Sequence, residues 1–337
     1  MAQYAQYGLA MADNAPKDGI LPGWLDPWPS PFHKAVELSG YGGIGIDWPH
    51  LISLFYTSIP IFVVVMIVSL VLKKQIYPRL GIALGISRTN KKKQRKFANQ
   101  LWLFSFYAGN AIFGYYVQYD KPWFSVPQTL DHVREFFTGF PDEPYPLMIF
   151  YYSLSFAFYA SELVSLFIET KRSDFWEYVV HHIVTIILFV MTYAAREHNM
   201  GVYVIFLHDA SDIFLCLAKC CHYVNFQAGV NVGVGLFMAG FVLFRFMCLP
   251  VVITACFYIS PVIRKAAVNF YVLAHLLLFV IQLLHVFWFY LILRMVIRLV
   301  RGVKGDARSD TDNDTADKKK KQIKSESTSK PSSPKNE

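Results

Sequence analysis

Long apolar stretches that are almost free of charge divide this sequence and decide which folds it can adopt. A helix needs about 20 consecutive apolar residues to cross a bilayer, and about 17 is the lower limit. Six stretches meet this requirement readily: 51–72, 101–117, 147–168, 179–195, 231–257 and 266–297. Because 54% of the residues are hydrophobic and only 17% are charged, the sequence predicts an all-α membrane protein.

A seventh stretch, 201–217, is apolar except for three polar side chains, and hydropathy alone does not settle its status. Charge asymmetry does, because cytosolic loops are enriched in Lys and Arg. The loop after the first span and the C-terminal tail are both basic, so an even number of spans must separate them. Counting 201–217 gives that even number. The sequence therefore predicts seven transmembrane helices, with a luminal N-terminus and a cytosolic C-terminus. The basic residues of the loop are Lys73, Lys74, Arg79, Arg88, Lys91, Lys92, Lys93, Arg95 and Lys96.

The remaining composition excludes several classes of protein. The net charge of +8 lies in loops and the tail without an aromatic-and-basic motif, so no nucleic acid is expected as a partner. The five cysteines form neither a disulfide framework nor a CxxC metal pattern. No signal peptide precedes the first span, which we expect to stay in place as an anchor.

Two carboxylates, Asp209 and Asp212, lie inside the predicted seventh span, where each costs about 2.5–3.5 kcal/mol to insert. At about 100° per residue they share one face of the helix with His208. The preceding span carries His181 and His182 near its cytosolic end. A short turn joins the two spans, which therefore run antiparallel and pack together. We expect the histidine pair and the aspartate pair to meet near the cytosolic edge of the membrane.

This polar cluster has three chemical interpretations. It can be a network that holds two spans together. Zinc bound by two His and two Asp is chemically possible, but the histidine boxes of membrane di-iron enzymes are missing, and we expect no metal. Acyl transfer needs a base or nucleophile and a group that orients it, and a histidine beside an aspartate supplies both. Five ionisable residues exceed what a structural clamp needs, which favours catalysis.

The residues around the cluster resemble a known family. The stretch 165–223, which contains VVHHIVTIILF and FLHDASD, closely resembles the Lag1 motif of ceramide synthases. Similar segments flank it: Lys96-Phe97 with Trp102, Lys121-Pro122-Trp123-Phe124, Arg245 with Pro250, Leu284-His285 with Trp288 and Arg294, and Arg308-Ser309-Asp310. The resemblance divides the chain into a luminal segment 1–50, a first span and basic loop 51–96, a TLC domain 97–300 and a disordered cytosolic tail 301–337.

Resemblance to ceramide synthases implies a multi-pass protein of the endoplasmic reticulum membrane that joins a fatty acyl group from acyl-CoA to the amine of a sphingoid long-chain base. Acyl-CoA is then a co-substrate, and no further cofactor is expected. Either a histidine attacks the thioester in a ping-pong reaction, or a histidine is the general base for direct attack by the amine. The implied catalytic residues are His181, His182, Asp209 and Asp212, and the substrate-binding residues are His208, Arg245, Trp288 and Arg294.

Simpler roles stay open for several of these residues. The two arginines could pair with the acids, bind a phosphate of coenzyme A or extend to a membrane interface. Positions in the interfacial aromatic belt are expected for Trp123, Trp176 and Tyr178, and packing positions for His275 and His285.

Two residues, Asn199 and Cys216, depart from the family's usual pattern, which bears on substrate detail and leaves the histidines and aspartates untouched.

A non-enzymatic TLC-domain protein that handles lipids or assists translocation is a rival function, although such relatives generally lack the paired histidines. A seven-helix receptor would give the aligned polar residues no purpose. Membrane lipids are expected contacts. Acyl length, which in this family depends on the loop at 258–265 here, stays open, as does a homodimer or an accessory subunit.

Overall fold

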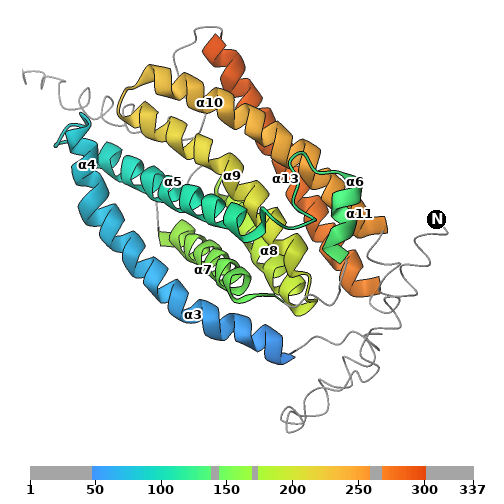
Figure 1. Cartoon of the computed structure of the whole chain (residues 1–337). Coiled ribbons are helices and arrows are strands. Elements are labelled where there is room, and N and C mark those ends of the chain that lie inside the picture. The colour runs from blue at the N-terminus through green and yellow to red at the C-terminus, as the bar shows by residue number, and fades with distance from the viewer. Residues whose placement is uncertain (1–47, 138–143, 169–173, 259–267, 301–337) are drawn as a thin grey trace, which may run out of the picture.

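The computed structural model describes residues 48–137, 144–168, 174–258 and 268–300 of the chain (Figure 1). Within these ranges the regular secondary structure is entirely helical. The helical elements are α3 Trp48–Val71, η2 Leu72–Ile76, α4 Tyr77–Ala83, α5 Lys91–Gln118, α6 Leu130–Arg134, η3 Glu135–Phe137, α7 Pro146–Ile168, α8 Phe175–Ala194, α9 His198–Tyr223, α10 Gln227–Phe241, η4 Val242–Cys248, α11 Leu249–Tyr258 and α13 Val268–Val300.

Each of the seven predicted spans coincides with a helix, and six helical stretches of the described residues are long and apolar enough to cross a membrane. The predicted span 201–217 is among the six, as part of α9. The helix that falls outside the group is α5, which contains the predicted span 101–117 but is more polar along its length. The all-helical membrane fold is thus confirmed with six spans, and α5 as a seventh crossing stays a prediction.

Helix α9 lies in the middle of the bundle, between α5 on one side and α10 on the other (Figure 1). In its most apolar 18-residue window 61% of the residues are buried inside the protein, compared with 22% in the first span. Because protein rather than lipid surrounds α9, its polar side chains find partners within the bundle. This is why a helix of modest hydropathy can hold a central position.

The first span is longer than its apolar run suggests. Helix α3 continues without a break through η2 and α4 to Ala83, so Lys73, Lys74 and Arg79 stand on a helix and not in the loop to which the sequence assigned them. The π-helical turn η2 carries both lysines. The connecting loop begins only after Ala83, and α5 starts at Lys91, where the side chain of Asn90 caps the helix by accepting a hydrogen bond from the Lys93 amide at 3.0 Å.

A second π-helical turn, η4, lies between α10 and α11 and contains Arg245. Pro250 follows it and lacks the amide that would bond to the carbonyl of Phe246 in a regular helix. A π turn changes the register of the helix and often occurs at functional sites. The side chain of Gln282 on α13 donates to the carbonyl of Arg245 at 3.2 Å, which satisfies a backbone group within the irregular turn.

Several predictions fall outside the described residues. The luminal segment 1–50, apart from its last three residues, and the tail 301–337 are among them, as is most of the loop at 258–265.

The contact between α9 and α10 yields a testable prediction. A Cβ atom added to Gly233 would lie 2.9 Å from Cβ and 3.0 Å from Cα of Ala218, so Gly233→Ala must push two backbones apart. We expect a loss of about 1–3 kcal/mol in stability, the usual result of overpacking. Thermal unfolding in one detergent measures it. Gly235→Ala is the control, because nothing lies within 4 Å of that position. Equal melting temperatures for the two variants would contradict the close packing.

Candidate functional site

Helices α5, α7, α8, α9, α10 and α13, together with η4, enclose a cavity of about 520 Å³. Both helices that the sequence predicts to carry the polar cluster, α8 and α9, contribute to this cavity. We call it the central cavity, and its lining residues are Tyr107, Tyr159, Tyr178, His181, His182, His208, Asp212, Leu215, Phe237, Phe241, Arg245, Trp288 and Ile292.

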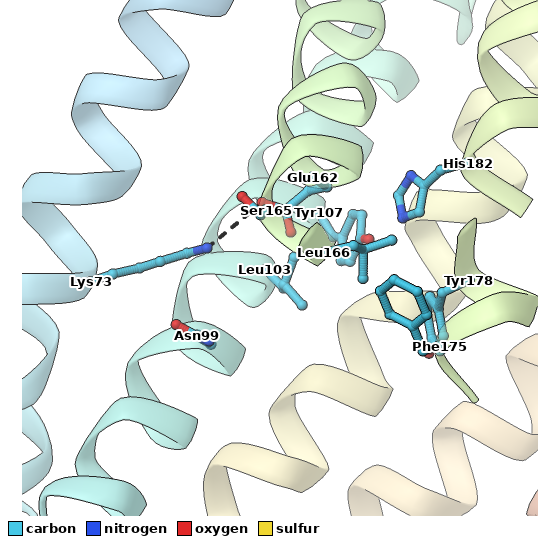
Figure 2. Close-up of a pocket in the computed structure, with 10 residues that line it drawn as sticks. All are labelled: Lys73, Asn99, Leu103, Tyr107, Glu162, Ser165, Leu166, Phe175, Tyr178 and His182. Carbon is cyan, nitrogen blue, oxygen red and sulfur yellow. Dashed lines mark ion pairs between the residues drawn. The ribbon is translucent and has the colours of Figure 1, made fainter. Parts of the chain in front are cut away.

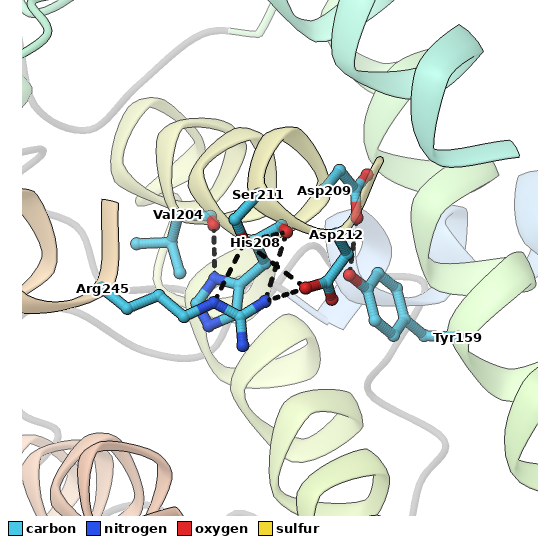
Figure 3. Close-up of polar contacts among 7 residues, drawn as sticks. All are labelled: Tyr159, Val204, His208, Asp209, Ser211, Asp212 and Arg245. Carbon is cyan, nitrogen blue, oxygen red and sulfur yellow. Dashed lines mark hydrogen bonds and ion pairs between the residues drawn. The ribbon is translucent and has the colours of Figure 1, made fainter. Parts of the chain in front are cut away.

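An ion pair between Arg245 and Asp212 lies at one wall of this cavity (Figure 3). An Nη atom of the arginine is 2.7 Å from Oδ1 of the aspartate, and the side chains are only 5% and 25% exposed. The guanidinium also donates to the hydroxyl of Ser211 at 3.1 Å and to the carbonyl of His208 at 3.3 Å. Of the roles open to Arg245, pairing with an acid is therefore correct, and extension to an interface is wrong.

Asp209 faces the other way, towards α5 and α7. Its carboxylate accepts hydrogen bonds from Asn110 at 2.5 Å and from the hydroxyl of Tyr159 at 2.7 Å. Asn110 donates a further hydrogen bond to Ser155 at 2.9 Å. The Asp209 side chain is fully buried and does not line the central cavity, whereas Tyr159 does. Asp209 therefore acts on the cavity through the tyrosine that it holds (Figure 3).

The imidazole of His208 is fixed by its own helix. Its Nδ1 lies 2.7 Å from the carbonyl oxygen of Val204, which can only accept, so Nδ1 carries the proton and Nε2 carries the lone pair. Nε2 is buried and has no hydrogen-bond partner among the described residues. A neutral imidazole held in one tautomer with an available lone pair is suited to act as a general base.

The histidine pair lies on the α8 side of the cavity. The ring of His181 lies 6.3 Å from that of His208 and 5.2 Å from that of Trp288, measured between centroids. His182 turns towards α7, where its ring is 5.9 Å from Tyr159. The buried Nδ1 atoms of both histidines lack hydrogen-bond partners among the described residues. The histidine pair of α8 therefore lies beside Tyr159 and His208. The two aspartates of α9 are bound to other groups.

Two further pockets adjoin the central cavity. One of about 870 Å³ is almost entirely apolar and is lined by α7, α8, α9, α11 and α13, with His181 and His208 among its residues together with Glu197 from the turn between α8 and α9. The central cavity shares Tyr159, His181 and His208 with it. The other, of about 640 Å³, is more polar and shares Tyr107, Tyr178 and His182 with the central cavity. The consecutive residues His181 and His182 thus face different pockets.

The structure places the other predicted residues as follows. Trp288 lines the cavity, and its buried Nε1 has no hydrogen-bond partner among the described residues. Arg294 is exposed on α13 and does not line the cavity. Trp176 is 68% exposed, as an interfacial position requires, but Tyr178 turns inward and lies 5.2 Å from Trp288 between ring centroids. The interfacial position expected for Tyr178 stays a prediction.

Sequence reasoning missed three side chains that contact the predicted site residues. His285, predicted to pack, is fully buried with its ring 5.1 Å from His208, and both of its nitrogens lack partners among the described residues. Its position one turn before Trp288 was a signal that could have revealed it. Tyr159 and Asn110 carried no such signal, because neither stands directly beside another polar residue that would mark it within its helix.

The donor set does not resemble a metal site. Among the described residues, no group of three or more His, Cys, Asp or Glu side chains is arranged to hold a metal ion. Ser211, the hydroxyl nearest the ion pair, donates to the carbonyl of His208 at 3.0 Å and accepts from Arg245. Oδ1 of Asp212 lies 3.4 Å from the same hydroxyl, so Ser211 is part of the hydrogen-bond network around the ion pair. The arrangement offers instead three imidazoles, one tautomerically fixed, around a buried cavity.

Fold and site together define a multi-pass helical membrane protein with a buried histidine cluster between its spans. The sequence pattern of the TLC domain matches residues 96–294, which is more than half of the chain. The chain belongs to this TLC domain family, and its relatives there include ceramide synthases.

The similarity to these relatives covers about two thirds of the chain. This chain is 32% identical over 243 residues to ceramide synthase LOH1 of Arabidopsis thaliana, and the match spans 67% of this chain and 76% of that protein. It is 31% identical to human ceramide synthase 3 and 34% identical to the mouse protein of the same name. Those matches span 67% and 65% of this chain, and 59% and 56% of the respective relatives. The chain therefore matches little more than half of these two mammalian proteins.

The buried ion pair yields a prediction. In Arg245→Met, Asp212 loses its cation inside the bundle, and we expect a loss of about 3 kcal/mol, the lower end for a broken buried pair, because the Asp212 side chain is still 25% exposed. Thermal unfolding measures it, and adding Asp212→Asn should restore part of the loss. In the control Arg134→Met, which breaks a surface pair with Asp131, the change should stay within about 1 kcal/mol. Equal losses would contradict a special role for the buried pair.

Proposed function

We propose that this protein is an N-acyltransferase of the ceramide synthase type, which transfers a fatty acyl group from acyl-CoA to the amine of a sphingoid long-chain base. One observation carries the proposal: His181 and His208 line both the apolar pocket and the more polar central cavity. An acyl chain in the apolar pocket would bring its thioester carbonyl to these imidazoles. Apolar pockets with a few polar groups at one end are typical binding sites for such ligands.

In the ping-pong form of the reaction, His181 attacks the thioester carbonyl carbon. A C–N bond to the imidazole forms, the C–S bond breaks, and the imidazole proton passes to the leaving thiolate, which departs as the thiol of coenzyme A. The amine nitrogen of the long-chain base then attacks the same carbon. The amide forms as the bond to His181 breaks, and the proton lost by the amine goes to the imidazole. Direct attack by the amine, with His208 or His181 as base, reaches the same product.

Both forms require a donor for the oxyanion that develops at the carbonyl. Trp288 supplies one, since its buried indole N–H has no partner among the described residues and its ring packs edge-on against His181 at 5.2 Å. The guanidinium of Arg245 adds positive charge to the cavity wall. Asp212 then holds Arg245 in place, and Asp209 holds Tyr159, so both aspartates position other groups.

The cellular arrangement follows from the same proposal. A seven-span protein with a luminal N-terminus, residing in the endoplasmic reticulum membrane, would open this site towards the cytosol. Acyl-CoA would then arrive from the cytosol, and coenzyme A would return to it. The long-chain base would enter from the membrane. No cofactor beyond acyl-CoA as co-substrate is required, and a homodimer or accessory subunit remains compatible with the fold.

The role of His181 can be tested with purified protein. We expect His181→Ala to lose at least about 100-fold of the amide formation from acyl-CoA and sphinganine, the scale of general acid–base or nucleophilic assistance, without loss of folded protein. Mass spectrometry of intact wild-type protein after acyl-CoA alone should show an acyl adduct that is absent from the variant. The control is His222→Ala, which changes an exposed histidine on α9. Inactive wild-type protein would favour the non-enzymatic rival.

The apolar pocket gives a second test. Ala274 on α13 lines this pocket, so Ala274→Phe should fill part of it and shift the preferred acyl-CoA to a shorter chain. A series of saturated acyl-CoAs of graded length measures the preference. Leu276→Phe, at a position that is 58% exposed on the same helix, should leave it unchanged. An unchanged preference in Ala274→Phe would show that the acyl chain lies elsewhere.

A further inference from the structure

The polar pocket beside His182 has no role in the mechanism so far. It lies between η2, α5, α7 and α8, and Figure 2 shows Lys73 reaching into it from one side while His182 stands on the other. We call it the acceptor pocket, and its lining residues are Lys73, Asn99, Leu103, Tyr107, Glu162, Ser165, Leu166, Phe175, Tyr178 and His182. It shares no lining residue with the apolar pocket, so the two can hold different molecules at once.

Glu162 is the unusual residue of this pocket. It is a carboxylate within the predicted span 147–168, and its side chain is only 14% exposed. The indole of Trp102 donates to its Oε1 at 3.0 Å, which fixes the direction of the carboxylate. An ionisable residue inside a membrane helix is expensive to insert and generally marks a binding site or pathway. A carboxylate held in such surroundings attracts a cation strongly, because little water screens its charge.

Lys73 shows which kind of cation suits this position. Its alkylammonium group reaches from η2 across to Glu162, with Nζ at 3.9 Å from Oε1 (Figure 2). That distance is beyond a direct hydrogen bond and leaves this contact a loose ion pair. The acceptor pocket therefore already receives a primary ammonium on a flexible hydrocarbon chain. A long-chain amine presents the same group on the same kind of chain.

We propose that the acceptor pocket binds the head of the long-chain amine, with the carboxylate of Glu162 accepting a hydrogen bond from its ammonium group. This inference rests on the proposed function, since it names the pocket that receives the second substrate. Asn99 and Ser165 offer polar groups for the hydroxyls of a sphingoid head, and Leu103, Leu166 and Phe175 form an apolar wall for the start of its chain. The carboxylate also disfavours the phosphates of acyl-CoA, which separates the two substrates by charge.

The location fits the reaction. His182 lines both the acceptor pocket and the central cavity, so an amine bound near Glu162 meets an imidazole before it reaches the acyl group. The bound ammonium must lose one proton before its nitrogen can attack, and His182 is placed to receive it. The neutral amine then forms the C–N bond of the amide, the acyl carbon releases His181 or the thiolate of coenzyme A, and the second proton lost by the nitrogen passes to that leaving group. Glu162 thus binds the ammonium group and accepts no proton during the reaction.

Substitution of the carboxylate tests this pocket. We expect Glu162→Gln to raise KM for sphinganine at least tenfold while KM for acyl-CoA and the yield of acyl adduct with acyl-CoA alone stay unchanged. A merely structural role would lower kcat or the amount of folded protein for both substrates together. Asp131→Asn makes the same chemical change at an exposed position on α6 and should alter neither constant. An unchanged KM for sphinganine in an active Glu162→Gln overturns the inference.

A measurement on the wild-type protein covers the case in which the variant does not fold. N,N-dimethylsphinganine is protonated at neutral pH, keeps one N–H donor and cannot form the amide, whereas the corresponding diol without nitrogen has neither the charge nor this donor. We expect the charged analogue to compete with sphinganine at least tenfold better than the diol. Equal competition would overturn the inference even though amide formation stands. Failure of the wild-type protein to form any amide would instead defeat the proposed function itself.

Discussion

A bilayer offers no water to a charged group, so a charge inside this bundle is stable only where another part of the protein pairs with it. The pair of Arg245 and Asp212 meets this constraint and joins η4 to the central helix α9. The same guanidinium bonds the hydroxyl of Ser211 and the carbonyl of His208. His208 in turn lies beside His181 and His285. The ion pair and the π turn that carries its arginine therefore lie beside the group formed by His181, His208 and His285.

Much of this arrangement could be predicted from the sequence. Hydropathy located the helices, and the spacing of His208 and Asp212 put them on one face of α9, because a helical period of 3.6 residues fixes such relations locally. Charge asymmetry identified 201–217 as a membrane helix where hydropathy did not. The reason is now visible in the packing: α9 is surrounded by other helices, so its composition reflects protein neighbours more than lipid.

The partners of each polar group could not be predicted, because they depend on how helices distant in sequence rotate against one another. Asp209 binds Asn110 and Tyr159, on α5 and α7, and neither aspartate contacts the histidines in the way that a hydrolase triad suggests. The π turn that orients Arg245 has no sequence signature beyond the proline that follows it. Glu162 escaped notice because one acid among 23 residues of α7 barely changes the mean hydropathy.

The separation of the two outer pockets has an evolutionary consequence. Because no described residue lines both, a substitution that reshapes one leaves the known walls of the other untouched. In related proteins with the same arrangement, the preference for a fatty acyl chain and the preference for an amine could therefore evolve independently, because mutations in one pocket would not alter the other. The two adjacent histidines on α8 are where the two pockets come nearest in the sequence, since His181 lines the apolar pocket and His182 lines the acceptor pocket.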